Sequence, residues 1–275
     1  MNEIWKAVAS GLISMSAVAC DQESHAPPDS SVVVLTFDGA DATSNEAIIQ
    51  HGNRLSKVLG CTGCHNQDLS GGPFNEGWIA PNLTLKVSEY DDLALDQAIR
   101  AGIALDGRKI RLMPSEMYRS LSGKDVEALI LYLRSLDPVG QAQPAFEPFA
   151  SDLVQWEADG YTDANALGLA WSEADGPVML GPEQARGRYL AMNLCTECHN
   201  DRLQGYPGFT PDLAIIAAYS DDAFNRLLHK GKGNVREELG LMSMVSPARF
   251  QHLTDRELAE LTDYLRARAS ARREQ

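Results

Sequence analysis

Long apolar runs and basic segments are both scarce in this 275-residue chain. After the N-terminal segment no stretch of eighteen or more apolar residues occurs, so we expect no membrane-spanning helix in the mature protein. Residues 21–50 and 141–180 contain no Lys or Arg and carry six and seven acidic residues, nearly all of the formal net charge of −14. We interpret them as a solvated acidic lead-in and an acidic connector. Nucleic-acid binding is not expected, because phosphate contacts need a basic face.

The first twenty residues have the layout of a secretory signal. Lys6 precedes an apolar run over residues 7–19, and small residues lead into Cys20. We therefore expect 1–20 to be a signal peptide that exports the protein. The small residues also resemble a lipoprotein cleavage site, which predicts a lipidated Cys20 and membrane association through that lipid. The alternative is simple cleavage nearby, with Cys20 lost or left as a thiol.

Cysteine is scarce as well, with five residues in the chain. Four of them lie in two copies of the motif C-x-x-C-H. The copies are Cys61-Thr62-Gly63-Cys64-His65 and Cys195-Thr196-Glu197-Cys198-His199. Two thiols one helical turn apart can add to the two vinyl groups of haem, while the adjacent histidine ligates the iron. The sequence therefore predicts two covalently attached haem c groups, with one C-x-x-C-H motif for each.

Two other readings of paired cysteines are less favoured. A redox C-x-x-C pair needs a strand followed by a helix, as in thioredoxin. A zinc site normally draws its cysteine pairs from within about twenty residues of each other, whereas here they begin at Cys61 and Cys195. Nothing else in the sequence suggests such a long-range assembly.

The surroundings of the motif repeat too, which favours an internal duplication. The matching features are Arg54 and Arg188 before the motifs, Leu69 with Gly71 and Leu203 with Gly205 after them, and the segments Tyr90–Gly102 and Tyr219–Gly231. Each copy closes with a helical pattern, over 126–136 and 258–269, and Ser122 and Thr254 are the expected N-caps. We predict two copies of one domain, over 51–140 and 181–270.

Further segments indicate a family. They are Gly52-x-Arg54-Leu55, Pro81-Asn82-Leu83-Thr84, Met113-Pro114 and Tyr132-Leu133-Arg134-Ser135-Leu136. With the haem motifs, they make both halves resemble class I cytochrome c domains, and the pair resembles two-haem bacterial cytochromes related to the cytochrome subunits of periplasmic alcohol and gluconate dehydrogenases. The alcohol dehydrogenase subunits usually carry three haem domains, whereas only two motifs occur here.

The resemblance implies an all-α fold of two tandem domains, each with three to five helices around a covalent haem. It implies a periplasmic electron carrier rather than an enzyme, with a dehydrogenase as donor and another cytochrome or an oxidase as acceptor. It also implies that the carbonyls of Pro81 and Pro211 accept a hydrogen bond from the haem-ligating histidines. Short extended pieces, such as 32–37, would not change the fold class.

Each iron needs two axial ligands, and we expect His65 with Met113 and His199 with Met242. Thioether sulfur favours the ferrous state. Met113 lies ahead of the first closing helix, and Met117 is the alternative, more suited to packing.

Ahead of the second closing helix stand Met242 and Met244, which point opposite ways in an extended loop. The resemblance favours Met242, and Met244 stays open as the alternative. Met179 and Met192 are expected in the core. The other histidines (His25, His51, His229 and His252) are not expected to bind iron.

The second functional hypothesis is a two-haem peroxidase. It would require one iron with an open or displaceable sixth position and acid-base groups nearby. Candidate methionines in both halves argue against an open iron. A redox sensor or docking subunit ranks last, because the sequence shows no signalling domain.

Overall fold

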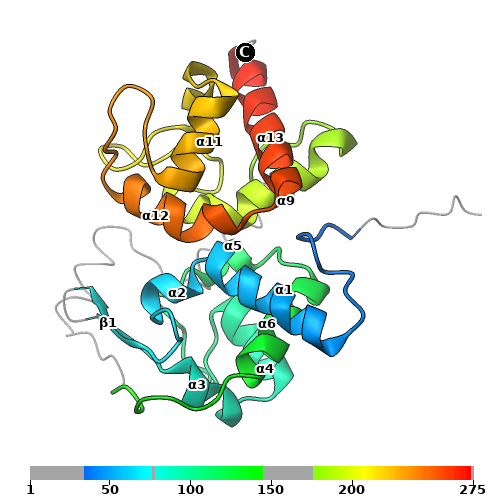
Figure 1. The fold of residues 1–275 in the computed structure, drawn as a ribbon, viewed down its shortest axis with the longest axis vertical. Coiled ribbons are helices and arrows are strands. Elements are labelled where there is room, and N and C mark those ends of the chain that lie inside the picture. Colours follow the sequence, from blue (N-terminus) through cyan, green and yellow to red (C-terminus); the bar gives the residue numbers. More distant parts are fainter. Residues whose placement is uncertain (1–33, 76–77, 145–175, 274–275) are drawn as a thin grey trace, which may run out of the picture. The chain divides into compact units, whose positions relative to one another are not determined.

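The computed structural model describes residues 34–75, 78–144 and 176–273, and from Val34 on it forms one compact unit (Figure 1). The expected signal peptide, Cys20, His25 and most of the acidic connector lie outside the described residues. The fold is mostly helical, which confirms the all-α prediction. No described helix is long and apolar enough to cross a membrane.

The first half opens and closes with longer helices and has short elements between them. Its elements are α1 (Asn45–Val58), α2 (Cys61–Cys64), β1 (Gly72–Asn75), β2 (Trp78–Ala80), α3 (Leu83–Lys86), η1 (Val87–Glu89), α4 (Asp92–Asp96), the π-helical turn η2 (Gln97–Ala101), α5 (Ser115–Tyr118) and α6 (Gly123–Arg134). The strands β1 and β2 pair in an antiparallel hairpin. This hairpin was not predicted, whereas the expected extended piece has no strand over its described residues 34–37.

The second half repeats the plan without a hairpin among its described residues. Its elements are η3 (Pro182–Gln184), α9 (Ala185–Leu194), α10 (Thr196–His199), η4 (Leu213–Ala218), α11 (Asp221–Lys230), α12 (Leu241–Arg249), η5 (Phe250–His252) and α13 (Asp255–Arg273). In each half the opening helix packs on the closing helix, α1 on α6 and α9 on α13. The repeat in the sequence is thus a repeat in the fold.

Both closing helices begin at the predicted caps. Ser122 Oγ accepts from Asp125 N at 3.0 Å, and Thr254 Oγ1 accepts from Glu257 N at 3.1 Å. The N–H of Thr254 in turn donates to the carboxylate of Glu257 at 2.9 Å, which completes a capping box. In the first half the N–H of Ser122 instead donates to the hydroxyl of Tyr189, from the second half, at 3.2 Å.

Glycine allows the close approach of opening and closing helices. A Cβ at Gly52 would overlap the carbonyl oxygen of Ala128, and one at Gly187 would overlap that of Glu260. Gly52 and Gly187 are therefore equivalent, so Arg54 corresponds to Tyr189 and not to Arg188, as the distance from the motifs had suggested. The first half has one residue more than the second between its opening helix and its motif. This extra residue is Gly60, which is left-handed with φ of +88°.

The segments after the motifs also repeat in detail. Arg134 Nη2 donates to Tyr90 O at 2.9 Å, and Arg266 Nη2 donates to Tyr219 O at 2.9 Å. Each arginine also contacts the acidic residue two positions after that tyrosine. The closing helix of each half thus fixes the start of the helix that follows this tyrosine.

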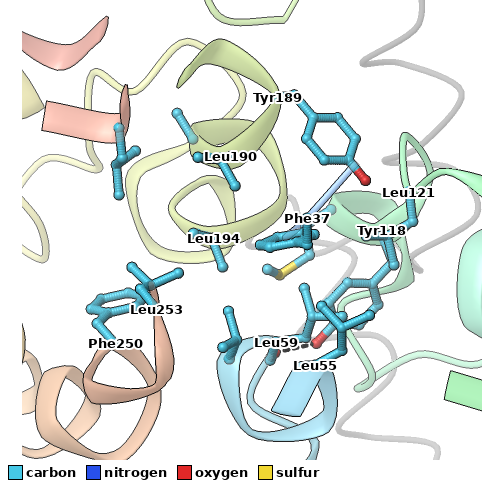
Figure 2. Close-up of a cluster of buried hydrophobic side chains, with 14 of the residues drawn as sticks. Phe37, Leu55, Leu59, Tyr118, Leu121, Tyr189, Leu190, Leu194, Phe250 and Leu253 are labelled. Carbon is cyan, nitrogen blue, oxygen red and sulfur yellow. Dashed lines mark hydrogen bonds between the residues drawn. The ribbon is translucent and has the colours of Figure 1, made fainter. Parts of the chain in front are cut away.

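Buried side chains of the two halves form one continuous apolar cluster (Figure 2). Phe37 contacts Tyr189 edge to face, with ring centroids 5.6 Å apart. Tyr118 donates to the backbone oxygen of Leu59 at 2.7 Å inside this cluster. Because burial of apolar area is the main stabilising term, the halves stabilise each other.

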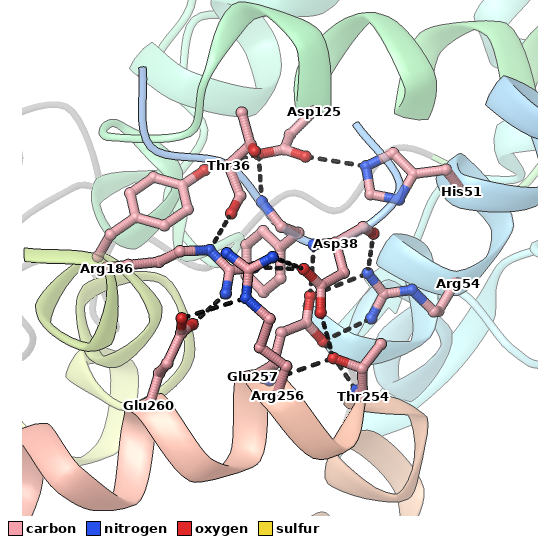
Figure 3. A network of polar contacts seen from close by, with 12 residues as sticks. Thr36, Asp38, His51, Arg54, Asp125, Arg186, Thr254, Arg256, Glu257 and Glu260 are labelled. Carbon is pink, nitrogen blue, oxygen red and sulfur yellow. Dashed lines mark hydrogen bonds and ion pairs between the residues drawn. The ribbon is translucent and has the colours of Figure 1, made fainter. Parts of the chain in front are cut away.

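A polar network lies beside the apolar cluster, and it is reciprocal (Figure 3). Arg54 of the first half contacts Glu257 at the start of the second closing helix. Tyr189, the structural equivalent of Arg54 in the second half, donates to Asp125 at the start of the first closing helix, at 2.7 Å. Equivalent positions thus meet in both directions, as in a two-fold symmetric interface.

Candidate haem-binding sites

The first motif forms a single turn of helix directly after α1. Cys61 and Cys64 are the ends of α2, and His65 N donates to Cys61 O at 2.9 Å. The ring Nδ1 of His65 lies 2.9 Å from the carbonyl oxygen of Pro81. The backbone turn therefore places the two thiols and the imidazole on one short segment.

The second motif has the same geometry. His199 N donates to Cys195 O at 2.9 Å, and Cys198 lies in the same turn, in α10. The ring Nδ1 of His199 lies 2.8 Å from the carbonyl oxygen of Pro211. Both prolines named by the resemblance thus contact the expected histidines.

These contacts determine which ring nitrogen is available to a metal. A carbonyl oxygen only accepts, so Nδ1 carries the proton in both His65 and His199, and Nε2 keeps its lone pair. Burial lowers the pKa of both rings, although the bonds to Pro81 and Pro211 oppose the shift. Both imidazoles are therefore neutral and oriented, as a metal ligand requires.

An unusual backbone follows each histidine. Asn66 and Asn200 have φ of +63° and +58°, and Leu69 and Leu203 have φ of +60° and +59°. The amide of Asn66 donates to Gly71 O, and that of Asn200 donates to Gly205 O at 2.6 Å. Left-handed leucine is strained, so its occurrence twice marks a loop held in one shape. Neither asparagine was predicted as a site residue, although asparagine directly after each motif histidine is a signal for a left-handed residue.

The four motif cysteines form no disulfide in the described part of the chain. Burial raises the pKa of Cys61 to about 11 and that of Cys195 to about 12. Within the described ranges no three His, Cys, Asp or Glu residues are grouped to hold a metal ion, and the first motif follows a helix rather than a strand. Neither the zinc reading nor the thioredoxin-type reading gains support.

The candidate sixth ligand of the first half, Met113, is partly buried against the core and precedes α5. Met117 is 2% exposed and belongs to the apolar cluster. Because Met117 is enclosed by apolar side chains, packing accounts for it.

The candidate ligand of the second half lies in a helix, not in the extended loop that the sequence suggested. Met242 occupies the first turn of α12 and is partly buried, whereas Met244 is 66% exposed. Ser246, one turn after Met242 on the same face, is fully buried, yet its hydroxyl has no partner in the described chain. This face of α12 therefore points inward.

The two remaining methionines that were expected in the core lie elsewhere. The prediction for Met179 was wrong, since this residue is 77% exposed, and Met192 is half-buried.

The other described histidines have different surroundings. His51 Nε2 lies 2.9 Å from Asp125 Oδ1 within the polar network. His252 O accepts a hydrogen bond from Arg54. The Nε2 of His229 is buried without a partner in the described part of the chain, at the end of α11. The donor set of each half, two thiols, a neutral imidazole and a partly buried thioether, fits a covalently attached haem.

Comparison with known proteins agrees with this chemistry. The family model for cytochrome c matches residues 49–137 and 184–269. The chain is 26% identical to the gluconate 2-dehydrogenase cytochrome c subunit of Pantoea cypripedii, over 83% of this chain and 61% of that protein. It is 24% identical to the alcohol dehydrogenase (quinone) cytochrome c subunit of Gluconacetobacter polyoxogenes, over 82% of this chain and 56% of that protein.

A further relative belongs to an oxidase. The CcoP subunit of the cbb3-type cytochrome c oxidase of Helicobacter pylori (strain 52) is 32% identical over 46% of this chain and 40% of that subunit. The chain thus spans less than two thirds of the length of each of these three relatives. Since the family model covers both halves, including both C-x-x-C-H motifs, the chain belongs to the cytochrome c family, whose members bind haem c covalently and transfer electrons.

Proposed function

We propose that this protein is a two-haem periplasmic electron carrier, with one haem in each of the domains over 51–140 and 181–270. Cys61 and Cys64 hold the first haem and Cys195 and Cys198 the second. The axial ligands are His65 with Met113 and His199 with Met242. When bound, each haem supplies a one-electron couple between ferric and ferrous iron.

The repeated contact between histidine and proline carries this proposal. In both halves a carbonyl oxygen fixes Nδ1 of the motif histidine and leaves Nε2 for iron. The cysteines, the left-handed loop and a partly buried methionine also recur in both halves. The chain's own contribution is to hold these donors in a rigid, partly buried arrangement, so that little rearrangement accompanies a change of oxidation state.

The partners follow from the relatives. Two of them are cytochrome subunits of dehydrogenases and one is a subunit of an oxidase. We infer that this chain accepts electrons from a dehydrogenase and passes them to another cytochrome or an oxidase. It does not itself transform a substrate, because both irons have a methionine available as sixth ligand. In a peroxidase, one iron would instead be open to peroxide.

The test is expression together with a haem-attachment system, followed by intact-mass analysis. The wild type should carry two haem masses, and the double variant Cys61→Ala/Cys64→Ala should carry one. The matched double variant at Cys195 and Cys198 should also lose one haem. A wild-type mass without haem contradicts the proposal. Fast binding of carbon monoxide to the ferrous wild type, or turnover of peroxide at enzyme-like rates, would replace it with the peroxidase hypothesis.

The membrane attachment proposed for Cys20 needs a separate test, because this residue lies outside the described part of the chain. Wild type and Cys20→Ser should be compared by fractionation of the expressing cells. A lipid on Cys20 predicts that the wild type sediments with membranes and that Cys20→Ser is released into the periplasmic fraction. Equal solubility of the two proteins contradicts lipidation.

A further inference from the structure

Arg249 lies between the two candidate haem-attachment segments. It is the last residue of α12 and is only 8% exposed. Its Nη1 contacts Glu197 Oε2, inside the second motif, at 2.7 Å. Its Nε and Nη2 donate to the backbone oxygens of Val58 and Leu59, just ahead of the first motif, at 3.2 and 2.9 Å. One guanidinium therefore binds both segments.

The first half makes room for this guanidinium at Gly60. A Cβ on Gly60 would lie 2.9 Å from Cζ and Nε of Arg249. The left-handed backbone of Gly60 also disfavours any residue with a side chain. Gly60 is the extra residue that the first half has between its opening helix and its motif. Arg249 contacts the first half beside this extra residue.

The equivalent position in the first half carries no charge. Phe250 and Tyr118 correspond, because each carbonyl accepts a hydrogen bond from the third residue after it, just ahead of the closing helix. Met117 is thus the equivalent of Arg249, and it belongs to the apolar core. The repeated fold therefore does not require a cation here. A buried charge is destabilising unless it is paired, which Glu197 and the two carbonyls accomplish.

The charge of Arg249 lies beside both motifs, because its guanidinium contacts Glu197 inside the second motif and the carbonyl oxygen of Leu59, two residues ahead of the first. Burial lowers the pKa of Arg249 itself, but the carboxylate of Glu197 raises it and the net shift is upward. Arg249 is therefore a permanent cation close to both attachment segments.

A fixed positive charge near a redox centre stabilises its reduced form, because reduction adds one negative charge. We propose that Arg249 is a positioning residue shared by the two haem sites, where its charge raises both reduction potentials and its hydrogen bonds hold the two attachment segments together. This inference rests on the proposed two-haem electron carrier. Glu197, which carries the opposite charge, lowers the same potentials.

The test compares charge-altering variants of the haem-loaded protein by potentiometric titration, with each haem followed in the visible spectrum. Arg249→Met introduces the residue that stands at the equivalent position of the first half. This variant should lower the equilibrium constant for reduction about tenfold at both haems, which is a fall of ~59 mV in the potential of a one-electron couple. Arg249→Lys keeps the charge and should restore most of that loss. Glu197→Gln should shift both potentials upward. Arg256→Met is the control, because the side chain of Arg256 is 65% exposed, and it should change neither.

The outcomes separate this inference from the proposed function. Haem content is determined first by mass, and a wild type without two haems contradicts the proposed function before any potential is measured. With two haems present, unchanged potentials in Arg249→Met, or a shift at one haem only, overturn the shared role. If Arg249→Met fails to fold or to retain haem, the other two variants decide. Both haem potentials preserved in Arg249→Lys, together with both potentials raised in Glu197→Gln, support the shared role of Arg249. Any other result overturns that role.

Discussion

Arg54 and Glu257 form a two-point contact between the halves, with Nη1 at 2.7 Å from Oε2 and Nη2 at 3.0 Å from Oε1. The Glu257 side chain is fully buried and that of Arg54 is 22% exposed. Glu257 also accepts a hydrogen bond from Asp38 N at 2.8 Å. The carboxylate therefore connects the lead-in, the first opening helix and the second closing helix.

Removing one partner of this pair should be strongly destabilising. Arg54→Met leaves the buried Glu257 carboxylate without its cation, and we expect the free energy of unfolding to fall by about 3 kcal/mol. Lys124→Ala is the control, because Lys124 and Asp41 form an exposed pair for which the loss should stay below about 1 kcal/mol. Urea denaturation followed by circular dichroism measures both. Equal midpoints for the two variants would contradict the structural role of Arg54.

The helix contacts at Gly52 and Gly187 lead to a second prediction. Gly52→Ala and Gly187→Ala would each bring a methyl group onto a carbonyl of the closing helix, so each should lower the melting temperature by several degrees through separation of the helices. Gly123→Ala is the matched control: Gly123 also lies in a helix, a Cβ there would meet nothing within 4 Å, and alanine should be neutral or slightly stabilising. A tolerated Gly52→Ala would argue against the close packing of α1 on α6.

The methionine ligands can be tested one at a time. Met113→Ala and Met242→Ala should each abolish one methionine-to-iron absorption band and lower the reduction potential of that haem, because thioether stabilises ferrous iron. Met244→Ala, which alters an exposed side chain in the same helix, should leave the spectrum unchanged. The reverse result, with the band lost in Met244→Ala and kept in Met242→Ala, would assign the ligand to Met244.

Glu116 should make stability depend on pH. Burial raises the pKa of its carboxyl from 4.5 to about 7, and the charge of Glu197 adds to the rise. Between these values the folded state holds a proton that the unfolded chain has released, so the free energy of unfolding falls as pH rises, by up to ~1.4 kcal/mol per pH unit.

The corresponding measurement is urea denaturation at pH 5 and pH 8. Glu116→Gln should flatten the change between the two pH values and should be more stable than the wild type at pH 8. Glu127→Gln alters an exposed acid in α6 and should leave the wild-type slope intact. An unchanged slope in Glu116→Gln would mean that another group titrates.

The chemistry-bearing segments could be predicted from sequence because they are local. The C-x-x-C-H motifs, the caps at Ser122 and Thr254 and the repeat from Tyr90 and Tyr219 depend on residues within one or two turns of each other. Pairing the residues of the two opening helices by their distance from the motifs was wrong by one residue, because Gly60 has no counterpart in the second half. Only the packing of Gly52 against Ala128 and of Gly187 against Glu260 reveals this.

The contacts between the halves could not be predicted. Arg249 stands far in sequence from Val58 and Leu59, and no periodicity or spacing links them. Its interior position contradicts the usual preference of arginine for the surface. Met242 was expected in an extended loop ahead of the second closing helix, but it lies in the first turn of a helix that begins directly after Gly240. Such placements depend on tertiary packing rather than on local preference.

The reciprocal contacts of Arg54 with Glu257 and of Tyr189 with Asp125 are those that two identical subunits would make around a dyad. In such a homodimer every substitution occurs twice, so an arginine at the position of Arg249 would bring a second cation into the same buried interior. Joining both copies in one polypeptide removes this constraint, since Met117 and Arg249 can differ. Fusion thus gives the protein an asymmetric interior that no pair of identical chains could have.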